Sequence, residues 1–101
     1  NGQSFAFNGY LPVKPHERKV KIKELEKRSR NGRQSQIFIE TPYRNDAMLG
    51  DILEVCEAST KVCIAADITL PSAYIKTRRV QDWRQNRVTI GKRPCVFILM
   101  A

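Results

Sequence analysis

The sequence predicts a single α/β domain: a mixed sheet of about five strands, with two main helices and a short helical turn packed on its faces. Three observations predict it. Strand and helix patterns alternate over the first two thirds of the chain, which is typical of parallel strands joined by right-handed crossovers. Two strand patterns then follow each other without a helix, which indicates an antiparallel part. With 101 residues, 42% of them hydrophobic, the chain can bury one core but not a second lobe.

The chain opens with a strand pattern over residues 4–11, in which Phe5 and Phe7 share one face through the period of two. Pro15 then fits the first position of a helix. The Asn-Gly pair at residues 31–32 is a helix stop signal. Because this helix has few apolar residues, we expect it to lie on the outside of the domain.

The next two elements form a strand and a strongly amphipathic helix. The apolar run within residues 36–40 predicts a buried strand. Thr41 and Pro42 supply an N-cap and a first-position proline for a helix over residues 43–57. Apolar residues recur there at i, i+3, i+4 and i+7 from Leu49, which is the spacing of one helical face.

The last third of the chain adds three strands and one helical turn. Residues 61–66 form a continuous apolar strand, typical of a strand covered on both faces or packed between a helix and a partner. The alternating residues 74–80 predict an edge strand. Residues 82–86 predict one helical turn anchored by Trp83, and residues 95–100 predict the final strand.

The composition limits where the protein resides and what it binds. The longest apolar run, residues 95–101, is too short to cross a bilayer, and we see no signal peptide, so we expect a cytoplasmic protein with no membrane partner. His16 is the only histidine, and Cys56, Cys63 and Cys95 each lie in an apolar run. We therefore expect buried reduced thiols and no metal site. The chain begins without methionine and ends on an apolar strand, so we expect one domain of a longer protein.

The charge balance is strongly basic, with 18 lysines and arginines against 10 acids and a net charge of +8. Such an excess attracts polyanions, usually nucleic acid. A solvated basic face that only aids solubility is the alternative. Tyr10, Tyr43 and Tyr74 can stack on bases, although scattered tyrosines also serve packing. The basic residues fall into three groups: Lys14, Arg18 and Lys19; Arg28, Arg30 and Arg33; and Arg78, Arg79, Arg84, Arg87, Lys92 and Arg93.

Two acids lie where buried strands end. Glu40 and Asp67 would both lie at the carboxyl ends of strands, where open α/β sheets bind ligands. Acids at such positions can transfer protons or hydrogen-bond a ribose. Alternatively, nearby backbone amides satisfy them. Arg44 lies close to Glu40, so it makes either a salt bridge or a substrate contact.

Two stretches resemble a known family. Residues 5–14 read FAFNGYLPVK, which resembles the F-x-F-x-G-[FY]-L-P-x-K segment of bacterial ribosomal RNA ribose-2′-O-methyltransferases in the tetrapyrrole methylase superfamily. A basic helix follows that segment in the family, as residues 18–30 do here. Residues 37–44 read IFIETPYR and resemble the family's strand-to-helix stretch ending in E-[ST]-P-[HY]-R. The order and separation match, and with the strand pattern the resemblance covers most of the chain.

Residues 65–70 depart from the ribosomal branch. They read AADITL where members that methylate the ribose carry A-R-E-L-T-K, so Ala66 and Leu70 replace an arginine and a lysine. Residues 68–71 instead resemble the T-x-P of tetrapyrrole methylases in general, and residues 94–99 resemble their closing strand. The superfamily resemblance is therefore broader than the ribosomal one, and a paralogue with another acceptor is an alternative.

The resemblance implies a two-domain enzyme that binds S-adenosylmethionine between its halves. Residues 1–101 would be the C-terminal domain, the cofactor-loop domain would be missing, and the chain alone would be inactive. Family members are usually homodimers. No catalytic base is assigned to this half. By position, adenosine contacts fall on Ile39, Glu40, Ala65, Ala66, Asp67, Pro94 and Cys95, and contacts to a ribosomal RNA acceptor fall on Lys14, Arg18 and Arg44.

Three functions follow from these observations. The first is half of a ribosomal RNA ribose methyltransferase. The second is half of a methylase of a small or tetrapyrrole acceptor, whose binding should not weaken with salt as RNA binding does. The third is a non-catalytic basic module for binding or dimerisation, which a glycine-rich cofactor loop upstream of this chain would exclude.

Overall fold

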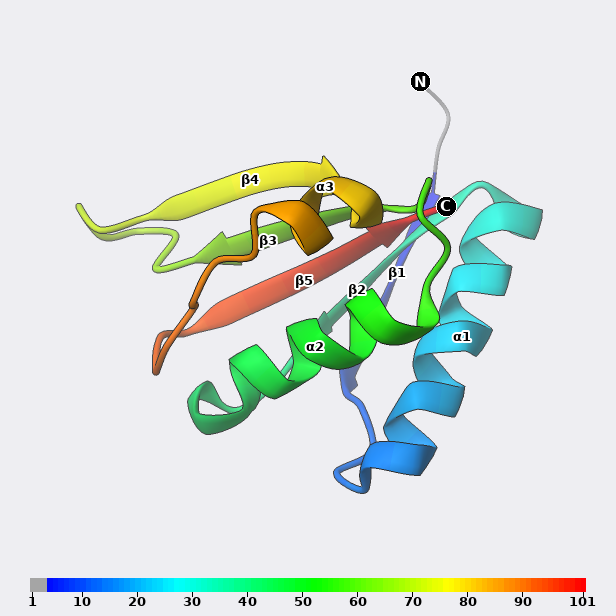
Figure 1. Ribbon diagram of the computed structural model, residues 1–101, viewed down its shortest axis with the longest axis horizontal. Helices are drawn as coiled ribbons and strands as arrows, with labels where there is room; N and C mark the ends of the chain where they lie inside the picture. The colour runs from blue at the N-terminus through cyan, green and yellow to red at the C-terminus, as the bar shows by residue number, and fades with distance from the viewer. Residues whose placement is uncertain (1–3) are drawn as a thin grey trace.

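The structure is a computed structural model that describes residues 4–101. These residues form one five-stranded sheet in the order β1-β2-β5-β3-β4 (Figure 1). β1 and β2 are parallel, and the other neighbours are antiparallel, so the predicted mixed sheet is confirmed. The elements are β1 (Ser4–Tyr10), α1 (Pro15–Gly32), β2 (Gln34–Ile39), η1 (Pro42–Arg44), α2 (Asn45–Val55), β3 (Lys61–Ala66), β4 (Tyr74–Arg79), α3 (Val80–Gln85) and β5 (Cys95–Met100).

The core lies between the helices and one face of the sheet. Phe38, Phe97 and Ile64 are neighbours across β2, β5 and β3, and all three are fully buried. The Phe38 and Phe97 rings stack with their centroids 5.7 Å apart. Leu25 of α1 and Trp83 of α3 belong to the same core. Within residues 4–101 all the helices therefore pack on one face, whereas the sequence favoured helices on both faces.

The other face of the sheet, which we call the open face, is covered by no helix of residues 4–101. Its side chains follow from the strand register, because laterally paired residues point to the same face. Several of them are large, apolar and exposed; Phe5 is 72% exposed and Ile75 61%. The open face comprises Phe5, Phe7, Tyr10, Ser35, Ile37, Ile39, Lys61, Cys63, Ala65, Ile75, Thr77, Arg79, Val96, Ile98 and Met100.

Helix α1 matches the predicted start and stop but is less peripheral than expected. Ile22 and Leu25 are fully buried, and so, unexpectedly for charged residues, are Arg18 and Glu26. The helix ends where Arg33 adopts a left-handed conformation with φ 49° and donates its backbone N–H to the Ser29 carbonyl. No helix in the described part of the chain is long and apolar enough to span a membrane.

Helix α2 is shorter at both ends than the sequence predicts. Residues 42–44 form a 3₁₀ turn, in which the Arg44 N–H donates to the Thr41 carbonyl at 2.9 Å. Thr41 makes no side-chain cap. The α-helix then begins at Asn45 and ends at Val55, because Cys56 is extended. The helix predicted over residues 43–57 is confirmed in its middle part, whereas both of its predicted ends are wrong.

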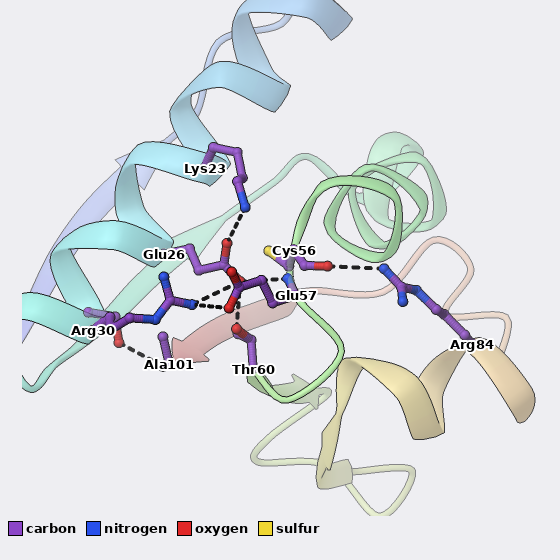
Figure 2. Close-up of polar contacts among 9 residues, drawn as sticks. Lys23, Glu26, Arg30, Cys56, Glu57, Thr60, Arg84 and Ala101 are labelled. Carbon is purple, nitrogen blue, oxygen red and sulfur yellow. Dashed lines mark hydrogen bonds and ion pairs between the residues drawn. The ribbon is translucent and has the colours of Figure 1, made fainter.

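A buried acid fixes the loop that follows α2. Glu26 of α1 is 1% exposed and accepts hydrogen bonds from the Thr60 hydroxyl, from the Glu57 N–H at 2.8 Å and from Lys23 Nζ at 2.9 Å (Figure 2). From the other side, Arg84 Nη2 donates to the Cys56 carbonyl at 3.0 Å. These bonds satisfy polar groups that the end of a helix leaves unpaired. α1 and α3 thereby hold the end of α2 between them.

The short helix α3 is the helical turn expected near Trp83, although it begins two residues earlier, at Val80. Trp83 is fully buried, and its indole N–H donates to the Val62 carbonyl at 3.0 Å. This satisfies the one polar atom of the side chain, as a buried tryptophan requires. The predicted anchoring role of Trp83 is confirmed.

Candidate functional site

A pocket of about 470 Å³ lies at the end of the sheet where β2 and β3 finish and β5 begins. Such strand ends are the usual ligand position in open α/β sheets. The volume is in the range of small-molecule sites, about 300–1,000 Å³. Its lining comes from four separate segments: Tyr10; Ile39, Glu40 and Pro42; Ala65, Asp67, Ile68, Thr69 and Leu70; and Pro94, Cys95 and Val96.

The structure brings together six of the seven residues that the sequence assigned to adenosine. The exception is Ala66, which is fully buried on the helix side of the sheet and pairs with Cys95. The side chains of Ala65 and Ala66 point to opposite faces of the sheet, and of the two only Ala65 lines the pocket. The residues brought together are Ile39, Glu40, Ala65, Asp67, Pro94 and Cys95.

Glu40 is buried, with 6% exposure, and two arginines compensate its charge. Its Oε1 accepts the Thr41 N–H at 2.7 Å and lies 3.5 Å from Arg44 Nη1. Its Oε2 lies 3.9 Å from Arg18 Nη1 and has no hydrogen-bond partner among the described residues. The backbone amide expected as the plain alternative is present, and the salt bridge expected for Arg44 is present too.

Asp67 begins the loop that forms one wall of the pocket. Its φ of 52° is left-handed, which is uncommon for a residue with a side chain. The backbone is held there by the Asp67 N–H, which donates to the Pro94 carbonyl at 3.0 Å, and by the Asp67 carbonyl, which accepts from Leu70 N–H at 2.9 Å. The carboxylate accepts from Ser72 Oγ at 3.1 Å and lies 3.6 Å from Arg93. Such enforced conformations gather at ligand sites.

The three residues assigned to an RNA acceptor differ in accessibility. Arg18 is 4% exposed, and its guanidinium donates to Asp51 and to the Val13 carbonyl, so its charge is used inside the protein. Arg44 is half-buried beside Glu40, whereas Lys14 is exposed. The geometry therefore presents Lys14 and Arg44, but not Arg18, to a ligand.

The cysteines are free and buried, as the sequence predicted. Burial, together with the nearby Glu26 charge, raises the pKa of the Cys56 thiol to about 12. Burial likewise raises the pKa of Cys95 to about 12. Both thiols are therefore neutral at physiological pH, and Cys95 offers the pocket a small apolar surface. Within residues 4–101 no cluster of three or more His, Cys, Asp or Glu residues could hold a metal ion.

Several lining residues were not assigned to the cofactor from the sequence. Tyr10, Ile68, Leu70 and Val96 all border the pocket. Ile68 and Leu70 are each 52% exposed, which is unusual for two large apolar side chains in one loop. The sequence contained a signal for both residues, because Ile68 directly precedes the Thr-x-Pro stretch after a buried strand and Leu70 is the middle residue of that stretch.

Comparison with known proteins agrees with this architecture. No family model matches the chain. Over 66 residues the chain is 39% identical to ribosomal RNA small subunit methyltransferase I of Vibrio cholerae, a match that covers 65% of this chain and 22% of that protein. The chain thus spans about a fifth of the length of this curated relative.

Two solved structures share the fold over nearly the whole chain. The methyltransferase CobJ matches with a TM-score of 0.57 at 19% identity, covering 98% of this chain and 41% of that one. Uroporphyrin-III C-methyl transferase from Thermus thermophilus, complexed with S-adenyl homocysteine, matches with a TM-score of 0.57 at 12% identity, covering 99% and 43%. The chain has the fold of these methyltransferase domains, and part of its sequence is similar to the Vibrio methyltransferase. The predicted fold is confirmed, and these similarities agree with the resemblance seen in residues 5–14 and 37–44.

Proposed function

We propose that this chain is the C-terminal half of a cytoplasmic S-adenosylmethionine-dependent methyltransferase that methylates a ribose 2′-oxygen of ribosomal RNA. One observation carries the proposal: the pocket takes lining residues from all four stretches whose sequences resemble the superfamily, residues 5–14, 37–44, 68–71 and 94–99. The related Vibrio protein is named for small-subunit ribosomal RNA, and the net charge of +8 suits a polyanion.

The pocket residues fit the adenosine part of the cofactor. Ile39, Ala65, Val96 and Leu70 provide apolar walls for a flat base, and the strand ends offer backbone N–H and C=O groups for its polar edge. The enforced turn at Asp67 fixes one of these walls. When bound, the cofactor supplies an electrophilic methyl group. This half contributes by holding the cofactor in a fixed position relative to the acceptor, and such positioning accounts for a large part of the rate enhancement of a bimolecular transfer.

In this proposal a second domain, outside residues 1–101, closes the pocket and supplies the catalytic base. The two structural neighbours are more than twice as long as this chain, because it covers 41% and 43% of them. The chain alone is therefore expected to be inactive. Lys14 and Arg44 contact RNA phosphates, and Arg18 acts through Glu40 by holding its carboxylate in place.

One observation favours a small or tetrapyrrole acceptor instead. Ala66 stands where ribose-methylating relatives carry an arginine, and it is fully buried, so no cation reaches the pocket from that position. The salt dependence of acceptor binding distinguishes the two acceptors. Each phosphate contact to a single strand lowers the slope of log K against log salt concentration by about 0.7. A small neutral acceptor has no such slope.

The test is calorimetric titration of S-adenosylhomocysteine into the full-length protein and into residues 1–101. We expect tight binding by the former and weak binding by the latter. Ala65→Leu should obstruct the pocket, whereas Ala47→Leu, on the exposed side of α2, should not. Methyl transfer to unmodified small ribosomal subunits then tests the acceptor. If neither protein binds the cofactor, the chain is a basic binding module and the proposal is wrong.

A further inference from the structure

Three aromatic side chains are arranged along the open face of the edge strand β1. Phe5 and Phe7 point there because they pair with Ser35 and Ile37. Tyr10 would point to the opposite face by simple alternation. The register shift between Phe7 and Tyr10 instead pairs Tyr10 with Ile39 on the open face, and Gly9, with φ 66°, lies within that shift.

All three rings are largely in solvent. Phe5, Phe7 and Tyr10 are 72%, 66% and 65% exposed, although they lie in a regular strand. One exposed apolar residue needs no explanation, but a contiguous group marks an interaction surface. The bulge that turns Tyr10 to this face makes the group contiguous.

A basic hollow of about 550 Å³ lies at the opposite end of the open face from the candidate site. The register places Ser35, Met100, Lys61 and Arg79 in one row across β2, β5, β3 and β4, and Arg33 also lines the hollow. Within residues 4–101 the side chains of Arg33, Lys61 and Arg79 have no ion pair or hydrogen bond. They are available to an anion.

The aromatic row joins the two ends of the face. β1 begins in the row of the basic hollow, where Phe5 pairs with Ser35, and ends at Tyr10, which lines the pocket. We infer that the open face binds single-stranded RNA, with phosphates on Arg33, Lys61 and Arg79 and bases stacked on the aromatic row. The strand would run toward the pocket. This inference rests on the proposed RNA acceptor.

The chemistry of the face favours RNA over a second copy of this chain. Three cations that are unpaired within residues 4–101 lie at one end of the open face, and the strand residues that make up this face include no carboxylate. A symmetric contact through this face would bury Lys61 and Arg79 without a partner charge, which is costly. The homodimer that the superfamily resemblance implies would then use another surface.

The test is fluorescence anisotropy of a labelled single-stranded RNA of about 12 nucleotides, within the usual site size. Phe5→Ala with Phe7→Ala should weaken binding about 25-fold or more, since base stacking contributes at least about fivefold per ring. Lys61→Gln with Arg79→Gln should weaken binding and reduce the salt slope by about 1.4. The matched control, Lys27→Gln with Lys76→Gln, removes the same charge from exposed positions off this face.

Each outcome decides the inference. Loss of binding in the open-face variants and not in the control supports it. Equal loss in the control, or no loss in either variant, overturns it. If Phe5→Ala with Phe7→Ala converts a dimer to a monomer by light scattering while RNA binding persists, the face is a protein interface and the inference is wrong. Phe5→Leu with Phe7→Leu, which keeps apolar area but removes the rings, repeats the test if the alanine variant unfolds.

The same variants distinguish failure of this inference from failure of the proposed cofactor site. S-adenosylhomocysteine titration of the full-length open-face variants should give unchanged binding, since neither Phe5 nor Lys61 lines the pocket. Cofactor binding together with RNA binding that the open-face variants leave unchanged overturns the inference alone, and RNA binding without cofactor binding overturns the methyltransferase proposal alone.

Discussion

Within residues 4–101, aromatic and polar side chains are buried and hydrogen-bonded on one face of the sheet but exposed and unpaired on the other. On the helix side, Phe97 is fully buried and the indole of Trp83 is hydrogen-bonded. On the open side, Phe7 is 66% exposed and Lys61 has no partner in the described part of the chain. The helix side buries its apolar side chains within the chain itself, whereas the open side leaves apolar area and charge exposed to a ligand. The predictions below test how sharply the two faces differ.

The largest difference is expected between two phenylalanines. Phe97→Ala removes a ring stacked on Phe38 in the centre of the core and should lower the free energy of unfolding by about 3–5 kcal/mol. Phe7→Ala, in the same sheet on the open face, should change it by about 0.5 kcal/mol or less, as exposed substitutions do. Urea unfolding followed by circular dichroism measures both. Comparable losses would mean that the open face is part of the folded core of this chain.

The next largest effect is expected at Glu26, the buried acid of α1, and concerns the pH dependence of the free energy of unfolding. Burial tends to raise the pKa of Glu26, but hydrogen bonds from Thr60, Lys23 and the Glu57 N–H outweigh it, so the pKa is lowered from 4.5. A carboxyl whose pKa is lower in the folded state stabilises above its unfolded pKa, and this contribution is lost as pH falls through the folded value. The free energy of unfolding should therefore fall with acid below about pH 5.

The matched variants are Glu26→Gln and Glu24→Gln on the same helix. Glu26→Gln should cost about 2–4 kcal/mol at neutral pH, because buried donors lose a charged acceptor. It should also flatten the acid slope. Glu24 is more exposed and pairs with Lys21 and Arg28, so its substitution should cost less than about 1 kcal/mol. Equal acid slopes in the parent and in Glu26→Gln would mean that other carboxylates carry the pH dependence.

The same contrast between faces explains what the sequence could and could not predict. Periodicity found every strand, because Ile37 and Val62 lie in apolar runs of strand length. It did not find that β5 lies between β2 and β3, because pairing between distant strands leaves no local pattern. The burial of Arg18 and Glu26 was not predicted, since a charged residue on a helix normally lies in solvent. Their burial depends on Asp51 and Thr60, which the chain brings close only after folding.

The candidate site was predictable to the extent that it depends on strand ends. Glu40 and Asp67 follow apolar runs, and the structure places both in the lining of the pocket. The resemblance also assigned Ala66 to the adenosine, and a continuously apolar strand does not reveal which of its residues faces which side. The open face was unpredicted for the same reason, although the register now fixes it.

The smallest effect is expected at the bulge that connects the aromatic row to the pocket. At Gly9 an added Cβ would meet nothing within 4 Å, so Gly9→Ala is opposed only by its φ of 66°. That conformation should cost about 1 kcal/mol. If the strand instead relaxes to regular pairing, Tyr10 turns away from the open face. Unfolding experiments measure the first effect, and acrylamide quenching of tyrosine fluorescence in a Tyr43→Phe, Tyr74→Phe, Trp83→Phe background measures the second. A destabilisation without any change in Tyr10 accessibility would mean that the register of β1, and not the glycine, holds the ring on the open face.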